Sequence, residues 1–168
     1  MEGTILLVDD EERNLRMLEA MLLPEGYRVI KANNGKVALE ILKSENVQAV
    51  LLDIMMPGLS GFDVLKMIRE NKDLCTLPVI VLTSLKDKDD RIKGLQLGAD
   101  DFILKPFDLD ELRAKINTQV KLDYLRRQLN ERAKLVKVMN EIDEGIIITD
   151  YNFVPFSINI KARKLLGI

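Results

Sequence analysis

Residues 49–58 read AVLLDIMMPG, an apolar run that stops at a carboxylate, Asp53, and then at a Pro-Gly break. The run is almost continuously apolar, which is typical of a strand covered on both faces. Four more runs of this kind occur, at residues 4–8, 27–32, 78–83 and 101–105. Segments of helical period separate these runs, so the pattern predicts a doubly wound α/β fold around a five-stranded parallel sheet.

The segments between the runs carry apolar residues three and four positions apart, as one face of an amphipathic helix does. In the first of them, Leu15, Leu18 and Leu22 fall on one such face. Gly, Pro and Asn residues mark the ends of elements, at residues 24–26, 33–35, 57–58 and 97–100. The alternation of strand and helix covers residues 1–121, which we expect to form one domain.

The composition is that of a soluble globular protein. Of its 168 residues, 47% are apolar and 31% are charged, which is enough to bury a core. A net charge of -2 attracts neither nucleic acid nor an anionic membrane, and no apolar run approaches a bilayer span. The chain has no histidine and a single cysteine, Cys75, so it can form neither an imidazole site nor an internal disulfide. An acidic start without an apolar leader favours the cytoplasm.

Polar side chains follow the strands at one edge of the predicted sheet. The carboxyl ends of parallel strands lie together, and ligands bind to such sheets there. In chain order these ends carry Asp9, Asp10, Asp53, Thr83, Ser84 and Lys105. Three neighbouring carboxylates repel one another unless a cation lies among them, and hard oxygen ligands with room for water suit Mg²⁺ better than Ca²⁺. Lys105 and Thr83 would bind charged oxygens, so the edge is suited to hold a phosphoryl group on Asp53.

Four separate motifs agree in order and spacing with one known family. They read LLVDDEE, LLDIMMPGLSGFDVL, VIVLTS and GADDFILKPF. On these motifs, residues 1–121 resemble the flavodoxin-like receiver domain of two-component response regulators, which implies the sheet order 2-1-3-4-5. The resemblance implies a signalling protein rather than an enzyme, one that catalyses only its own phosphoryl transfer and slow self-dephosphorylation.

The resemblance implies a metal site around a phosphorylated aspartate. Asp53 would accept a phosphoryl group from a sensor histidine kinase. Asp10, Asp53 and the backbone carbonyl of Met55 would bind Mg²⁺, with Mn²⁺ as the alternative metal, and Asp9 would help through water. On this reading Asp53 ends its strand because a carboxylate oxygen must attack phosphorus in line while the metal neutralises the transferring oxygens.

The resemblance also implies how the phosphoryl group is held and sensed. Thr83, Ser84 and Lys105 would bind its oxygens. Thr83 would move toward the group, and Phe102 would follow it as an aromatic switch residue. The peptide bond before Pro106 would be cis.

Two positions near the acceptor bear on how long the phosphoryl group lasts. Met55 lies two residues after Asp53, and Leu85 lies two residues after Thr83. Both are apolar where a polar side chain could hold an attacking water. We therefore expect slow self-dephosphorylation.

Three other functions can be weighed against the receiver. A phosphohydrolase of the haloacid dehalogenase type also sets an Asp nucleophile after an apolar strand, but it needs a second acid two residues later, where this chain has Met55. A nucleotide-binding module would need a loop rich in Gly or hydroxyl groups after the first strand, where DDEERN would repel phosphate. A DNA-binding regulator is an alternative for a full-length chain, although this fragment shows neither a helix-turn-helix pattern nor a basic face.

A long helix is expected after the sheet. Residues 108–142 contain no Gly or Pro, and at 1.5 Å per residue they would extend roughly 50 Å. An apolar seam, interrupted at Arg132, runs through Leu122, Leu125, Leu129, Val136 and Met139. We expect residues 122–138 to form a parallel dimeric coiled coil, with packing of the helix against the tail as the alternative.

The tail, residues 139–168, predicts a strand, a turn, a second strand and a short helix. It resembles the beginning of a PAS sensory domain, an α+β fold: DEGIIITD would be its first strand, VPFSIN its second and KARKLLG its first helix. Pro155 interrupts the second strand, where a backbone donor is lost. Two strands and a helix seldom form a stable core alone, so we expect a homodimer in which tail strands pair between chains, including exchange of whole segments.

Overall fold

The computed structural model describes residues 3–84 and 88–168, with the backbone alone at residues 88–91. The chain divides into two compact units, Met1–Asp123 and Tyr124–Ile168. The division of the chain into segments 1–121, 122–138 and 139–168 stays a prediction.

The first unit contains a five-stranded sheet in the order β2-β1-β3-β4-β5. Its strands are β1 (Thr4–Val8), β2 (Arg28–Ala32), β3 (Ala49–Asp53), β4 (Val79–Thr83) and β5 (Asp101–Leu104). All neighbouring strands are parallel, and the register places Val8 opposite Leu52 and Asp53 opposite Leu82. The predicted fold class and sheet order are confirmed.

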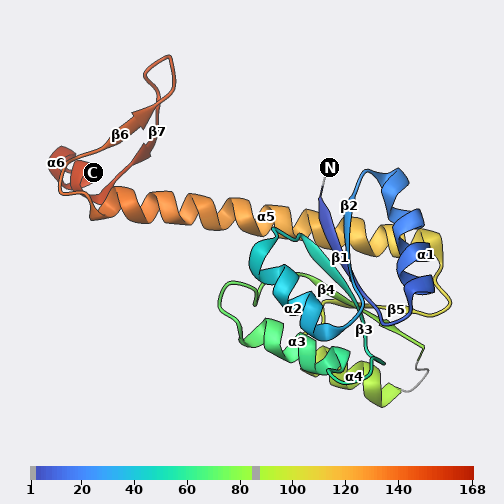
Figure 1. The fold of residues 1–168 in the computed structure, drawn as a ribbon. Helices are drawn as coiled ribbons and strands as arrows, with labels where there is room; N and C mark the ends of the chain where they lie inside the picture. Colours follow the sequence, from blue (N-terminus) through green and yellow to red (C-terminus); the bar gives the residue numbers. More distant parts are fainter. Residues whose placement is uncertain (1–2, 85–87) are drawn as a thin grey trace. The chain divides into compact units, whose positions relative to one another are not determined.

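Helices cover both faces of this sheet (Figure 1). They are α1 (Glu12–Leu22), α2 (Gly35–Ser44), α3 (Gly61–Glu70), α4 (Lys88–Gln96) and α5 (Leu109–Glu141), with a 3-10 turn η1 (Leu23–Glu25) after α1. Alternate residues of β1 enter different apolar clusters, Leu6 the one shared with α2 and α3 and Leu7 the one shared with α1 and α5. Because both faces are buried, the strands read as continuous apolar runs.

The long helix predicted over residues 108–142 is confirmed as α5, Leu109–Glu141. Its first turns bury Leu112 and Ile116 in the apolar cluster on one face of the sheet. No helix in residues 3–84 and 88–168 is both long enough and apolar enough to cross a membrane.

The second unit has a strand, a strand and a helix in the predicted order. They are β6 (Ile147–Thr149), β7 (Pro155–Ile158) and α6 (Ile160–Leu166), with β6 and β7 paired antiparallel. Pro155 is the first residue of β7, a place where a strand tolerates the missing backbone donor. The sequence is therefore compatible with strand pairing despite this proline.

One buried asparagine joins the parts of the second unit. The side-chain oxygen of Asn159 accepts from the backbone N–H of Ile146 and of Ala162, each at 2.9 Å. Its amide nitrogen donates to the carbonyls of Met139, at 2.8 Å, and Glu144, at 2.9 Å. Asn159 thereby links the last turns of α5 to the start of the hairpin and to the first turn of α6.

Candidate functional site

Three carboxylates meet at the carboxyl end of the sheet. Asp9 and Asp10 directly follow β1, and Asp53 is the last residue of β3, the strand beside β1. One oxygen of each carboxylate lies within 4.8 Å of the others. Asp9 and Asp53 are 0% and 5% exposed, whereas Asp10 is exposed. The strand order thus brings together acids that are far apart in the sequence.

Lys105 supplies a positive charge among these acids. Its Nζ lies 2.8 Å from Oδ2 of Asp9 and 2.9 Å from Oδ2 of Asp53. Its backbone N–H donates to the carbonyl of Thr83 at 2.9 Å, which fixes Lys105 beside the end of β4. The peptide bond between Lys105 and Pro106 is cis, as expected.

Burial and pairing shift the pKa values of two of these groups. Burial raises the pKa of Asp53, and the hydrogen bond and charge of Lys105 only partly counteract it. Burial lowers the pKa of Lys105, but its hydrogen bonds to Asp53 and Asp9, and their charges, outweigh burial and raise it. The lysine is therefore firmly cationic, while the Asp53 carboxylate is incompletely compensated. Such a donor set favours a further cation.

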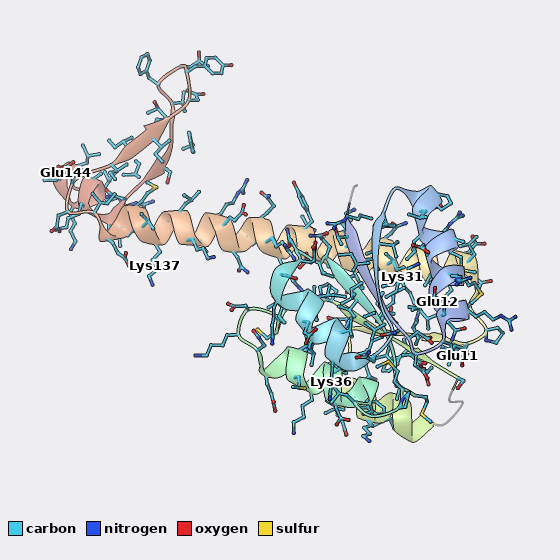
Figure 2. All side chains as sticks on the ribbon, in the orientation of Figure 1. Glu11, Glu12, Lys31, Lys36, Lys137 and Glu144 are labelled. Atoms are coloured by element: carbon cyan, nitrogen blue, oxygen red, sulfur yellow. The ribbon has the colours of Figure 1, made fainter. Side chains whose placement is uncertain are left out.

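Asp9 is held in place by groups at the start of α1. Its Oδ1 accepts from the backbone N–H of Glu11 at 2.9 Å, and the amide of Asn14 donates to both of its oxygens at 3.0–3.1 Å. With Lys105, Asp9 accepts from three different residues, which favours an indirect part in metal binding. The side chains of Glu11 and Glu12 continue the acidic run at this end of α1 (Figure 2). The sequence alone does not mark Asn14 as a site residue, because its contact with Asp9 depends on the local fold.

Gly61 shapes the loop that follows Asp53, although the sequence alone assigns Gly61 no role. It is the first residue of α3, and its N–H donates to the carbonyl of Ile54 at 3.0 Å. A Cβ on Gly61 would overlap the carbonyl oxygen of Asp53 and lie 2.7 Å from Cα of Ile54. Ser60 caps α3 in a reciprocal capping box with Asp63. The loop can fold back onto the end of β3 only because residue 61 has no side chain.

The remaining candidate residues near Asp53 differ in exposure. Thr83 is 1% exposed at the end of β4, and Ser84 is exposed. The backbone N–H of Met55 lies 3.4 Å from Oδ1 of Asp53, and the Met55 side chain is 62% exposed. Leu85 lies outside the described residues. Metal binding by the Met55 carbonyl and phosphoryl binding by Thr83 and Ser84 stay predictions.

Phe102, the expected switch residue, is buried in β5. It is 7% exposed and pairs with Val81, two residues before Thr83 in β4. The amine of Lys115 in α5 donates to the carbonyl of Phe102 and pairs with Asp101 at 2.7 Å. The backbone at Phe102 is therefore tied to α5, while its ring points into the apolar cluster on the other face.

Comparison with known families and proteins gives one consistent result. Residues 5–117 match the family described as "Response regulator receiver domain". The chain is 47% identical over 117 residues to "Probable transcriptional regulator ycf27" of Porphyridium aerugineum, covering 70% of this chain and 48% of that protein. It is 41% identical over 118 residues to "Response regulator PleD" of Caulobacter vibrioides (strain NA1000 / CB15N), covering 70% of this chain and 26% of that protein. The chain thus spans about half the length of the ycf27 relative and about a quarter of the length of PleD.

Solved structures resemble the same part of the chain. One is the receiver domain of the sensor histidine kinase PA1611 from Pseudomonas aeruginosa PAO1 with a magnesium ion coordinated in the active site cleft. It is 32% identical, with a TM-score of 0.67 over 72% of this chain and 99% of that one. Another is the response regulator TrrA from Thermotoga maritima in complex with Mg(2+)-BeF. It is 36% identical, with a TM-score of 0.63 over 70% of this chain and 98% of that one.

Proposed function

The chain belongs to the response regulator receiver domain family, and on that premise we propose that Asp53 accepts a phosphoryl group from a phosphohistidine of a sensor histidine kinase. The observation that carries the proposal is the setting of the Asp53 carboxylate. It is buried at the end of β3, 2.9 Å from the ammonium of Lys105 and beside two further acids. A carboxylate with a raised pKa and a fixed lysine is an arrangement suited to receiving a group with charged oxygens.

The transfer exchanges one phosphorus bond for another. An oxygen of Asp53 forms a bond to phosphorus, and the bond from phosphorus to the imidazole nitrogen of the kinase breaks, leaving its electron pair on that nitrogen. Lys105 would turn from the Asp53 oxygen to a phosphoryl oxygen while it keeps Asp9 as a partner. The hydroxyls of Thr83 and Ser84 would donate to the other phosphoryl oxygens.

Mg²⁺ is the metal that these donors fit. Asp10, Asp53 and the carbonyl of Met55 would bind it, and Asp9 would act through a water. All are hard oxygen donors, and the three carboxylates lie close enough to share one small ion; Mn²⁺ would fit the same set. When bound, the ion neutralises negative charge on the transferring oxygens. The two magnesium-containing structures above support this proposal.

Phosphorylation by a small donor tests the proposal directly. The chain is incubated with acetyl phosphate and MgCl₂, and the intact mass is measured over time. We expect one phosphoryl group per chain with MgCl₂, no phosphorylation when EDTA replaces MgCl₂, and none in Asp53→Asn. A variant at an exposed acid of α1, Glu12→Gln, is the control and should be phosphorylated normally. Labelling of Asp53→Asn at the wild-type rate would place the acceptor elsewhere.

We further propose that α5 carries the phosphorylation state to the C-terminal region and that this region makes a homodimer. The seam residues Leu122, Leu125, Leu129 and Val136 are 40–66% exposed. A row of such exposed apolar side chains on a helix is typical of a surface that packs on a second helix. We propose that the β6–β7 hairpin and α6 are the beginning of a PAS-like domain, whose strands pair between chains. Packing of the seam within one chain is the competing arrangement.

DNA binding by an output domain of a longer chain is a second candidate function. It is favoured by one observation, that the ycf27 relative is named a transcriptional regulator and extends well beyond the matched region. A gel shift with the full-length chain and its upstream DNA would test it.

A further inference from the structure

Helix α4 turns a glycine toward the sheet. Within residues 92–96, Gly94 is buried, whereas Ile92 and Leu95 are 41% and 56% exposed. A glycine inside a helix lowers stability relative to alanine, because it loses more backbone freedom on folding. A glycine at residue 94 of α4 is therefore expected only where a side chain would not fit.

The reason is the ring of Phe102. A Cβ on Gly94 would lie 2.8 Å from Cε1 and 3.1 Å from Cζ of that ring, and 3.6 Å from Cε1 of Phe62. The first distance is shorter than real Cβ contacts and the second is tighter than most, so either the ring or the helix would have to move. Phe102 is 7% exposed among close-packed neighbours, so the ring has little room inside the domain.

A second contact limits how far α4 itself could shift. The ammonium of Lys93 lies 4.5 Å from the centre of the Phe62 ring, which joins α4 to α3 beside Gly94. A methyl group at residue 94 would therefore act in one of two ways. It would push the Phe102 ring out of its buried position, or it would lift α4 from the sheet and away from Phe62.

We propose that Gly94 provides the space that the ring of Phe102, the expected switch residue, occupies. It is a positioning residue: by lacking a side chain it admits the ring of Phe102 beneath α4 and so sets the buried position of that ring. The inference rests on the proposed function, in which Phe102 follows Thr83 when Asp53 is phosphorylated. It adds that the buried position of the Phe102 ring depends on the absence of a side chain at residue 94. The phosphorylated state, which uses that ring position, would then depend on it too.

A double-mutant cycle of Gly94→Ala and Phe102→Ala tests whether Gly94 makes room for the Phe102 ring. In the wild-type background, Gly94→Ala should lower the urea midpoint, because the methyl group overlaps the ring. In the Phe102→Ala background the same change should raise the midpoint, because the overlap is gone and alanine favours the helix. Phe102→Leu serves as a second background if Phe102→Ala does not fold, and Gln96→Ala, on the exposed side of α4, is the control.

Beryllofluoride binding in the presence of Mg²⁺ separates positioning from packing alone. Gly94→Ala should raise the half-saturating beryllofluoride concentration, roughly fivefold, when Phe102 is present, and should leave it unchanged in Phe102→Ala. Two results would overturn the proposal: Gly94→Ala stabilising both backgrounds equally, or Gly94→Ala lowering the midpoint without changing beryllofluoride binding. If the wild-type chain does not bind beryllofluoride, the proposed function fails, and with it the link from Gly94 to the phosphorylated state. The urea cycle separately decides whether Gly94 sets the position of the ring.

Discussion

The ammonium of Lys105 lies 2.9 Å from a carboxylate oxygen of Asp53, although 52 residues separate the two in the chain. The contact exists because β3 and β5 lie on either side of β4, so that Lys105 reaches across the end of β4. Lys105 contacts Asp9 as well, and it therefore compensates two buried carboxylates with one charge. We therefore expect the stability of the domain and, on the proposed function, its phosphorylation to depend on the same side chain.

Replacing this lysine should reveal that dependence. Lys105→Met leaves Asp9 and Asp53 buried without their partner, and we expect a loss of about 3 kcal/mol in the free energy of unfolding. The matched control is Lys115→Met. Lys115 also has two acidic partners, but these are more exposed, so about 1 kcal/mol or less should be lost. Urea unfolding in EDTA measures both. Equal losses in the two variants would mean that Lys105 compensates no more charge than a surface lysine.

Mg²⁺ should stabilise the chain through Asp10. An ion that binds only the folded state adds about 2.7 kcal/mol when its concentration is 100 times the dissociation constant. We expect thermal unfolding, followed by circular dichroism because the chain has no tryptophan, to shift upward with MgCl₂. The shift should be small in Asp10→Asn and unchanged in Glu12→Gln. An unaltered shift in Asp10→Asn would remove this residue from the ligand set.

Gly61 should tolerate no side chain. The added methyl group of Gly61→Ala would meet the backbone of Asp53 and Ile54, which cannot move aside as a flexible side chain can. We expect a loss of about 3 kcal/mol and a large drop in the rate of phosphorylation by acetyl phosphate. Gly3→Ala is the control, because its methyl group would meet Tyr27 and Val120 at an ordinary 3.7 Å. Wild-type stability in Gly61→Ala would mean that the loop after β3 can reshape freely.

The fold could be predicted from the sequence because its decisive features are local. Leu51 and Leu52 are buried on opposite faces of the sheet, and this two-sided burial appears in the sequence as an unbroken apolar run. Asp53 could be predicted as a site residue because polar residues end several neighbouring strands, whereas a lone Asp at a strand end is more often a cap or turn residue. Strand order then determined which acids meet.

The residues that were missed depend on contacts that the periodicity of a helix or a strand does not encode. Gly61 and Gly94 are required by atoms of Asp53 and Phe102, and nothing within either helix reports how close those atoms come. Asn14 and Asn159 look like ordinary polar residues, yet Asn14 holds Asp9 across the turn between β1 and α1, and Asn159 reaches the end of α5. Local periodicity records burial, whereas these roles depend on tertiary packing.

The phenol of Tyr27 should titrate above its usual range. It donates a hydrogen bond to Asn117 in α5, and burial, followed by the charge of Glu25, raises its pKa above 10.0. A raised folded-state pKa contributes stability that is present below pH 10 and lost as pH rises through the folded value. Absorbance at 295 nm, wild type minus Tyr27→Phe, isolates this phenol, and the midpoint should lie above pH 10. The stability advantage of the wild type over Tyr27→Phe should shrink from pH 9 to pH 11. A midpoint at or below 10 would show that the phenol is not protected.

Dimer formation through the seam can be tested with one substitution and its neighbour. Leu129 is 66% exposed in the middle of the predicted coiled coil, where a lysine would lose the apolar contact in both chains. We expect Leu129→Lys to weaken the dimer about tenfold or more, and Asn130→Lys, which adds the same charge one residue away from the seam, to leave it intact.

Light scattering over a range of concentrations, with and without Mg²⁺ and beryllofluoride, measures the mass. If wild-type mass rises only with beryllofluoride, phosphorylation controls association; if a dimer is present throughout, the signal travels as a rearrangement within it. A wild-type monomer under all conditions would favour packing of the seam within one chain.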